Sequence, residues 1–284
     1  MTPTPGQAAS IVSIWRYPVK SMMGEELNAS EISKDGLAGD RAFALIDSSD
    51  EKIATAKNPK KWPHLFDFRA ALVQELETRT TAVRITLPDG TIVYSSDADV
   101  HRLLSDVLQR AVTLRARTQT DRPAAMAASA GASAGTAEEY WPDLEGLDHR
   151  DTVTEFGLPE GSFFDAASVH VLTTATLDRL RMLYPQGRFE TRRFRPNLVV
   201  RTDGQDGFVE NEWVGRVLAI GDSVRLSITA PCLRCVMTTL PQGDLPNDNG
   251  ILRTAAQHNR ASVGVYASVL QGGTVRRGDP VRLE

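Results

Sequence analysis

The chain has little of what marks a secreted, membrane or nucleic-acid-binding protein. Its 284 residues include only two cysteines, whereas a secreted disulfide scaffold carries more. No window approaches the roughly 18 apolar residues that span a bilayer. The first residues lack the charged and apolar segments of a secretory signal. The net charge of −4 is not the basic surplus of a nucleic-acid-binding protein. We therefore expect a cytoplasmic protein that binds neither membrane nor nucleic acid.

Several catalytic signatures are also missing from the sequence. It contains no G-x-G-x-x-G fingerprint, no G-x-S-x-G elbow and no clear motif of paired carboxylates. Cys232 and Cys235 form a C-x-x-C motif, but neither a second C-x-x-C nor an H-x3–5-H motif accompanies it. A structural zinc site needs four such ligands, so none is indicated.

Hydrophobic residues make up 41% of the chain, which is enough for a substantial core. The length predicts one large or two modest domains. Small residues dominate 123–137, where Ala, Ser and Gly bury too little area to fix a conformation. We expect a flexible loop or linker over 119–150, between units at 1–118 and 151–284. A short Ala-rich helix is the alternative, but recurring Ser and Gly disfavour it.

The first unit combines alternating apolar patterns with one helical pattern. We expect strands at 11–16, 27–32, 41–46 and 113–115, a turn at 36–40, a hairpin of 85–87 and 91–94, and a helix over 98–110. In the second unit, Thr173 or Thr174 is suited to cap a helix that ends near Leu183. Further strands are expected at 169–172, 198–201, 217–220, 224–228, 235–239, 264–270, 274–275 and 281–283. The pattern predicts an α+β, β-rich, barrel-like fold and not a doubly wound α/β fold.

The C-x-x-C motif admits several interpretations. It could be a redox pair or two ordinary buried cysteines, but a thioredoxin-like pair begins a helix, and this segment lies between expected strands. Arg234 precedes Cys235, and a nearby cation lowers the pKa of a thiol toward the thiolate that binds soft metals. A metal ligand at Cys235 is therefore favoured over a structural disulfide.

Two polar clusters are suited to bind anions. Lys20 and Ser21 follow an expected strand, where an ammonium, a hydroxyl and free backbone N–H groups suit a phosphate. Arg195 and Asn197 enter another expected strand, and they offer a guanidinium fork and an amide that can pair with a polar ring. The alternative for each cluster is an exposed turn.

Five separated motifs together resemble the MOSC family of molybdenum-cofactor proteins, in the arrangement with an N-terminal β-barrel domain. They are Tyr17-Pro18-Val19-Lys20-Ser21, Gly36-Leu37-Ala38-Gly39-Asp40-Arg41, Arg193-Phe194-Arg195-Pro196-Asn197, Arg234-Cys235-Val236-Met237-Thr238-Thr239, and Gly264-Val265-Tyr266 with the ending Gly278-Asp279-Pro280-Val281. The resemblance covers roughly residues 10–284. It implies an N-terminal MOSC-type β-barrel domain at 1–118 and a MOSC domain at 151–284.

The resemblance also implies a cofactor, a molybdenum–molybdopterin whose metal takes Cys235 as its protein ligand and catalytic residue. The cofactor-binding positions that it implies are Lys20, Ser21, Arg41, Thr173, Arg195, Asn197 and Tyr266. Cys232 falls on a position that is not a ligand and is expected to be dispensable. Leu233 departs from the pattern, because amidoxime-reducing members of the family have a small hydroxyl residue there.

The function implied by the resemblance is the reduction of a small N-oxygenated (N-hydroxylated) substrate at molybdenum. No further cysteines are present to hold an iron–sulfur cluster, so we expect a separate electron-donor protein. Two alternatives belong to other classes. One is a non-catalytic carrier of the molybdenum cofactor or of sulfur, and the other is a cofactor-free thiol protein that uses Cys232 and Cys235.

Overall fold

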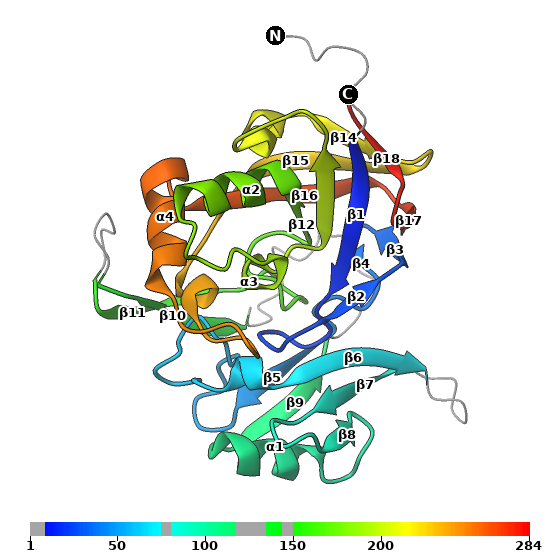
Figure 1. Cartoon of the computed structure of the whole chain (residues 1–284). Coiled ribbons are helices and arrows are strands. Elements are labelled where there is room, and N and C mark those ends of the chain that lie inside the picture. Colours follow the sequence, from blue (N-terminus) through cyan, green and yellow to red (C-terminus); the bar gives the residue numbers. More distant parts are fainter. Residues whose placement is uncertain (1–8, 75–80, 118–134, 144–149) are drawn as a thin grey trace.

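The computed structural model describes residues 9–74, 81–117, 135–143 and 150–284. Most of the predicted loop at 119–150 therefore lies outside the described residues. Figure 1 shows a barrel of long strands in the upper part and a smaller group of strands with one helix in the lower part. Among the described residues, no helix is long and apolar enough to cross a membrane.

The larger part is a closed barrel of seven strands. In hydrogen-bonded order they are β13 (Leu198–Thr202), β12 (Val169–Thr173), β16 (Ser262–Gln271), β15 (Val224–Leu233), β14 (Val217–Ile220), β18 (Pro280–Leu283) and β1 (Ala9–Arg16). Strand β1 closes the ring because it pairs antiparallel with both β18 and β13. The short strand β2 (Glu25–Leu27) pairs with the end of β1. The barrel thus combines a strand from the N-terminal end with strands of the C-terminal half.

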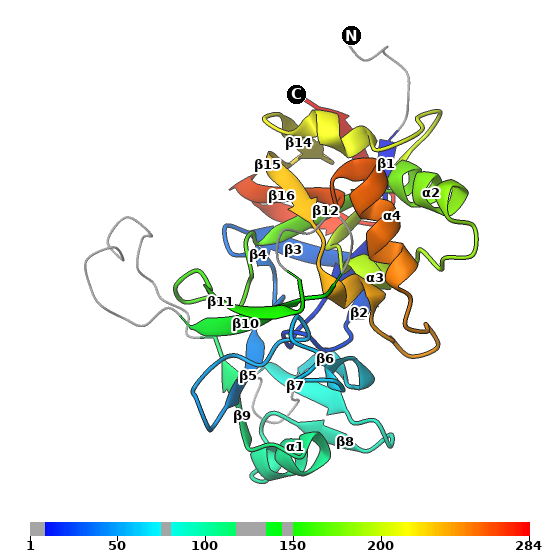
Figure 2. The ribbon, with the colours of Figure 1, turned by 90° about the vertical axis from the view of Figure 1, so that its left-hand side faces the viewer.

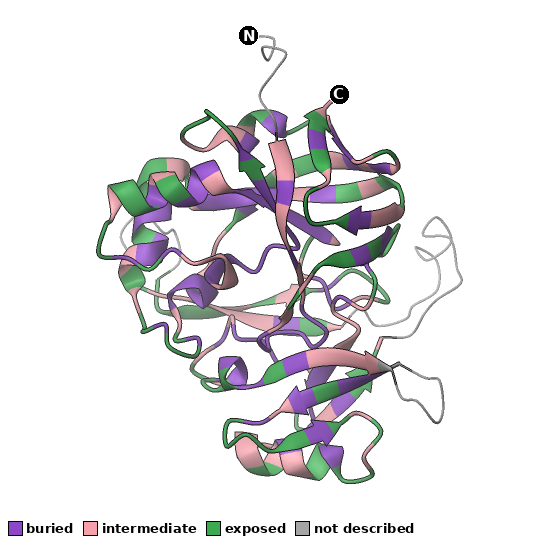
Figure 3. Ribbon diagram, turned by 45° about the vertical axis from the view of Figure 1, so that its right-hand side comes forward, coloured by how far each residue is buried: buried purple, intermediate pink, exposed green. Residues whose placement is uncertain are grey.

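A cluster of buried apolar residues forms the core of the barrel, and Figure 3 shows buried positions along its strands. Side chains alternate along a strand, so Ile11 and Ile14 would face opposite sides of a regular strand, yet both are buried. A register shift between Ile11 and Ser13 accounts for this, because a β-bulge adds one residue to the strand. Two further short strands, β3 (Ala29–Ser33) and β4 (Gly36–Leu37), form a separate sheet with β17 (Gly273–Arg276), which follows β16 in the chain.

The smaller part, which we call the N-terminal unit, has its own core. It contains the pair β5 (Phe43–Asp47) and β9 (Val112–Ala116), the sheet β6 (Arg69–Gln74), β7 (Thr81–Thr86) and β8 (Ile92–Tyr94), and the helix α1 (Val100–Leu108). Phe68, Ile85 and Leu104 are fully buried in this core. The predicted hairpin is confirmed, because β7 and β8 pair across the turn at Gly90.

The helices α2 (Thr174–Leu183), α3 (Thr191–Phe194) and α4 (Asn249–Asn259) lie on one side of the barrel (Figure 1). Helix α2 is the crossover between β12 and β13, whose parallel pairing requires one. The described part of the chain also contains the 3₁₀ helices η1 (Leu65–Asp67), η3 (Val209–Trp213) and η4 (Val236–Thr239).

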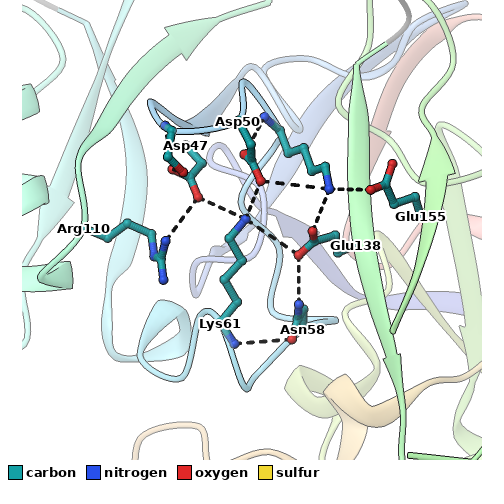
Figure 4. Close-up of polar contacts among 9 residues, drawn as sticks. Asp47, Asp50, Asn58, Lys61, Arg110, Glu138 and Glu155 are labelled. Atoms are coloured by element: carbon teal, nitrogen blue, oxygen red, sulfur yellow. Dashed lines mark hydrogen bonds and ion pairs between the residues drawn. The ribbon is translucent and has the colours of Figure 1, made fainter. Parts of the chain in front are cut away.

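The strands β10 (Thr136–Trp141) and β11 (Thr152–Gly157) form an antiparallel pair between the barrel and the N-terminal unit (Figure 2). Ion pairs fasten this pair to the segment after β5 (Figure 4). The carboxylate of Glu138 accepts from Lys52 at 2.8 Å and from Asn58 at 2.9 Å, and Lys52 also contacts Glu155. Beside Glu138, the ammonium of Lys61 is 3.0 Å from the buried Asp47. This network fixes β10 against the N-terminal unit.

The expected β-rich, barrel-containing fold is confirmed, but it differs locally from the expectation, and the strands β6 and β11 were not predicted. Residues 136–141 are strand β10 and not part of a loop. Residues 236–239 form η4 and not a strand, because the Thr238 and Thr239 hydroxyls donate back to carbonyls three residues earlier, at 3.0 and 2.8 Å. Helix α4 was not predicted, although Asp248 caps it by accepting from the backbone N–H of Gly250.

Candidate functional site

A cavity of about 810 Å³ lies between one end of the barrel and the N-terminal unit. All the predicted site residues except Thr173 line it: Lys20, Ser21, Arg41, Arg195, Asn197, Cys235 and Tyr266. They come from the segment after β1, the turn before β5, the end of α3, the end of β15, and β16. Segments that are distant in the sequence thus converge on one cavity, although their roles toward a ligand stay predictions.

Three of these residues have backbones that only glycine adopts readily. The φ angles are 63° at Ser21, 50° at Arg41 and 53° at Arg195. For other L-residues the left-handed conformation costs roughly 1–2 kcal/mol, so it persists where the surroundings enforce it, and such residues cluster at functional sites. At Arg195 this backbone ends α3, and the N–H of Arg195 donates to the carbonyl of Thr191 at 3.1 Å.

Arg195 is a buried cation without a carboxylate partner among the described residues. Only 6% of the residue is exposed, and its Nη1 donates to the carbonyl of Met22 at 2.7 Å. Its guanidinium lies 4.2 Å from the centre of the Tyr17 ring, while its Nη2 is buried without a hydrogen-bond partner. Burial, reinforced by Arg41, lowers the pKa of Arg195 to about 9. An unpaired buried donor costs roughly 1–3 kcal/mol, so this atom is suited to an anion bound in the cavity.

A cluster of charged residues at the cavity includes two that were not predicted from the sequence, Asp165 and Lys57. The Lys20 ammonium donates to the carbonyl of Phe163 at 2.8 Å and contacts the Asp165 carboxylate. Lys57 Nζ lies 3.6 Å from Asp165 and 3.3 Å from Glu139. Burial alone would raise the pKa of Asp165, but Lys20 and Lys57 hold it below its usual range. This carboxylate therefore stays ionised and orients the two ammonium groups.

The cavity as a whole carries an excess of positive charge. Six cationic side chains line it, Lys20, Arg41, Lys57, Arg195, Arg234 and Arg260, against three acidic ones, Asp40, Glu139 and Asp165. Arg41 is paired with Asp40 at 2.7 Å. The remaining surplus suits a ligand that carries phosphate or other negative groups.

Two predicted cofactor residues make their polar contacts within the protein. The Asn197 amide donates to Asp40 at 2.9 Å and accepts from the backbone N–H of His170 at 3.0 Å, so it ties segments of the cavity wall together. Thr173 lies outside the cavity lining. Its hydroxyl donates to Glu210 at 2.6 Å and accepts from the N–H of Thr176 at 3.2 Å, which makes it the predicted N-cap of α2.

The two cysteines differ in their surroundings. Cys235 is half-buried on the cavity wall, and burial raises the pKa of its thiol to about 11 although Lys57 opposes this. Arg234 also opposes this rise, as expected from its place beside Cys235, but the net shift of the pKa is away from the thiolate. Arg234 turns to the other cysteine, and its Nη1 donates to the Sγ of Cys232 at 2.7 Å. A metal at Cys235 would have to displace the thiol proton.

Comparison with protein families agrees with this architecture. The family model of the MOSC domain matches residues 159–282, and that of the MOSC N-terminal beta barrel domain matches residues 8–131. The chain belongs to the MOSC family and carries both of these domains. The exact boundaries at residues 118 and 151 stay predictions.

Similar proteins include two mammalian ones. Mitochondrial amidoxime reducing component 2 of Rattus norvegicus is 23% identical over 97% of this chain and 83% of that protein. Mitochondrial amidoxime-reducing component 1 of Mus musculus is 23% identical over 98% of this chain and 83% of that protein. Among solved structures, the YUAD protein from Bacillus subtilis covers 97% of this chain and 95% of its own, with 11% identity and a TM-score of 0.44.

Proposed function

We propose that this cavity binds a molybdenum–molybdopterin cofactor and that the chain reduces small N-hydroxylated substrates with it. The observation that carries the proposal is that Cys235, whose thiol can bind a metal, and the buried Arg195, whose Nη2 has no hydrogen-bond partner, line one cavity. The cavity volume of about 810 Å³ is in the range of small-molecule sites, which leaves room for a cofactor. Its positive surplus fits an anionic pterin phosphate.

The residues fall into distinct proposed roles. Cys235 is the protein ligand to molybdenum and the catalytic residue. Arg195 and Arg41 bind the anionic part of the cofactor, and Lys20 shares its ammonium between Asp165 and that part. Ser21 and Tyr266 contribute hydroxyl groups at the cavity. Asn197 and Thr173 act through the scaffold, because their polar atoms already bond within the protein.

When bound, the cofactor would supply the two electrons that, with two protons, convert an N-hydroxyl group to N–H and water. The chain's own residues hold the cofactor and shape the space for the substrate. Leu233, Phe164 and Trp141 line the same cavity and offer apolar surface to the carbon part of a small substrate. The names of the rat and mouse relatives support an amidoxime or another N-hydroxylated compound as the substrate. The electrons would come from a separate donor protein.

The test is a reduction assay on purified protein with its molybdenum content measured in parallel. A chemical reductant replaces the unknown electron donor, and a hydroxylamine and an amidoxime serve as substrates. We expect turnover in wild type and none in Cys235→Ser. Molybdenum without turnover on either substrate would contradict the reductase and favour the cofactor carrier. Absence of molybdenum from protein made in a cofactor-producing host would contradict both.

A further inference from the structure

Cys232 has a contact that is unusual for a dispensable core cysteine. It lies near the end of β15 and is 0% exposed. The Nη1 of Arg234 donates to its sulfur at 2.7 Å, and the Nη2 of Arg234 donates to the carbonyl of Phe194 at 2.9 Å. The guanidinium is therefore held between the end of β15 and the end of α3, on the wall of the cavity.

Arg234 has no carboxylate within ion-pair distance in the part of the chain that the structure describes. It is half-buried, and its Nε atom is buried without a hydrogen-bond partner. Desolvating a cation without a counter-charge costs several kcal/mol, so a neighbouring group is expected to ionise in response. The acidic groups that interact with it most strongly are Cys232 and Tyr266.

Of these two groups, Cys232 is the one that ionises more readily. An ordinary thiol loses its proton near pH 8.5 and a phenol near pH 10. Burial opposes ionisation of Cys232, but Arg234 and then His170 lower its pKa to about 6, with hydrogen bonds from His170 and Tyr266 contributing. Burial and the charge on Cys232 raise the pKa of Tyr266, which stays a neutral hydrogen-bond donor.

We propose that Cys232 is the thiolate counter-ion of Arg234 and acts as a positioning residue for the cavity wall that carries Cys235. The thiolate neutralises Arg234, whereas Arg195, with its buried and unpaired Nη2, has no counter-ion among the described residues and is suited to a bound anion. It also holds Arg234 to the carbonyl that precedes Arg195. This assignment changes the expectation that Cys232 is dispensable.

The direct test is the charge of Cys232 in the full-length wild-type protein. Because the chain has only two cysteines, ¹³Cβ-labelled cysteine gives two NMR signals, which Cys232→Ser and Cys235→Ser assign. We expect the Cys232 signal at the thiolate position at about pH 7.5, with a transition near pH 6. A thiol signal there would overturn the proposal, and this measurement does not depend on any cofactor.

Three variants test the partner and the positioning role. In Arg234→Gln the Cys232 signal should move to the thiol position at about pH 7.5, and an unchanged signal would overturn the pairing. Cys232→Asp keeps a negative charge and should retain at least half of the wild-type molybdenum content, whereas the uncharged Cys232→Ser should lose most of it. Equal molybdenum contents in wild type and Cys232→Ser would overturn the positioning role.

The positioning role rests on the proposed cofactor, but the charge assignment does not. If wild-type protein contains no molybdenum, the proposed function fails. The NMR result then still decides whether Cys232 is a thiolate paired with Arg234. If molybdenum is present and the Cys232 signal is that of a thiol, only the present inference fails.

Discussion

At the scale of single residues, Arg195 is central because its burial is unfavourable until an anion arrives. Among the described residues, a backbone carbonyl and the rings of Tyr17 and Phe66 contact its guanidinium, and no carboxylate pairs with it. A neutral side chain of similar length would suit the empty cavity as well or better. On the proposed function, a bound anion accounts for this positive charge, which the stability of the fold does not require.

The variant Arg195→Met separates these two roles. Replacing a buried, uncompensated charge with an apolar side chain is often neutral or stabilising, so the unfolding free energy should change by less than about 1 kcal/mol. The molybdenum content should fall at least tenfold, because the anion loses its buried donor. Arg192→Met is the matched control, since Arg192 pairs with Asp244 at the surface and should retain full content. Full molybdenum content in Arg195→Met would contradict the role of this residue.

At the scale of elements, a buried carboxyl group from η3 lies against the N-terminus of α2. The Oε2 atom of Glu210, on η3, accepts from the hydroxyls of Thr173 and Thr176, while its Oε1 is buried without a partner. Burial raises the pKa of Glu210 above its ordinary value of about 4.3. The folded state therefore binds this proton more tightly than the unfolded state does.

The stability of the protein therefore depends on pH through Glu210. The contribution of Glu210 to stability is fully present below about pH 4.3 and is lost as pH rises through the higher folded-state pKa. Glu210→Gln, which stays neutral, should therefore be more stable than wild type at about pH 8, by on the order of 1 kcal/mol, and should lose this advantage toward pH 4. Urea unfolding at several pH values measures this difference. A variant that is equally destabilised at every pH would show that burial does not raise the pKa of the Glu210 carboxyl.

The strand pair β10 and β11 gives a second prediction at the scale of elements. Glu138 is 16% exposed at its side chain and bonds both Lys52 and Asn58, whereas Glu155 is 59% exposed and contacts only Lys52 among the described residues (Figure 4). Glu138→Ala should cost about 1–2 kcal/mol, because it leaves partly buried donors unpaired. Glu155→Ala should cost less than about 0.5 kcal/mol.

Hydrogen exchange of residues 136–141 provides the readout for this pair of variants. Glu138→Ala should exchange faster than wild type in β10, whereas Glu155→Ala should match wild type. Equal exchange in the two variants would show that the network does not hold this strand. The next residue along β10, Glu139, lines the cavity, so a loosened strand should also weaken cofactor retention.

The sequence predicted elements with strong local signals and missed those that depend on distant partners. The strand β1 and a threonine cap for α2 were predicted correctly because neighbouring residues determine them, although a β-bulge interrupts the alternation of β1. Val236 to Thr239 have strand-like residues, but their hydroxyl contacts form a 3₁₀ helix instead. Asp165 and Lys57 were missed, because only the folded chain brings them to Lys20.

Adjacency in the sequence was also misleading for Arg234. It precedes Cys235, yet its side chain turns to Cys232, two residues earlier. The motifs that the sequence analysis singled out do line one cavity, because the fold brings these distant segments together, but their roles toward a cofactor stay predictions. The chemical roles within it depend on orientation, which the sequence does not specify.

At the scale of the whole molecule, the barrel and the N-terminal unit are connected through the N-terminal segment of the chain, and they share a cavity. Strand β1 comes from the N-terminal end of the chain and closes the barrel, and the cavity lies between the barrel and the N-terminal unit. We therefore expect one cooperative unfolding transition. Ile14→Ala, in the barrel core, and Leu104→Ala, in the core of the N-terminal unit, should each cost about 2–5 kcal/mol. Calorimetry should show one shifted peak in both variants, and two separated peaks would contradict this coupling.

The most direct test of the central claim is X-ray absorption at the molybdenum edge, on wild type and Cys235→Ser. The account predicts that wild-type protein contains molybdenum and that the variant loses one sulfur neighbour per metal. Cys232→Ser, whatever its molybdenum content, should keep the wild-type number of sulfur neighbours per metal. An unchanged number in Cys235→Ser, or a loss in Cys232→Ser alone, would contradict the assignment of Cys235 as the ligand.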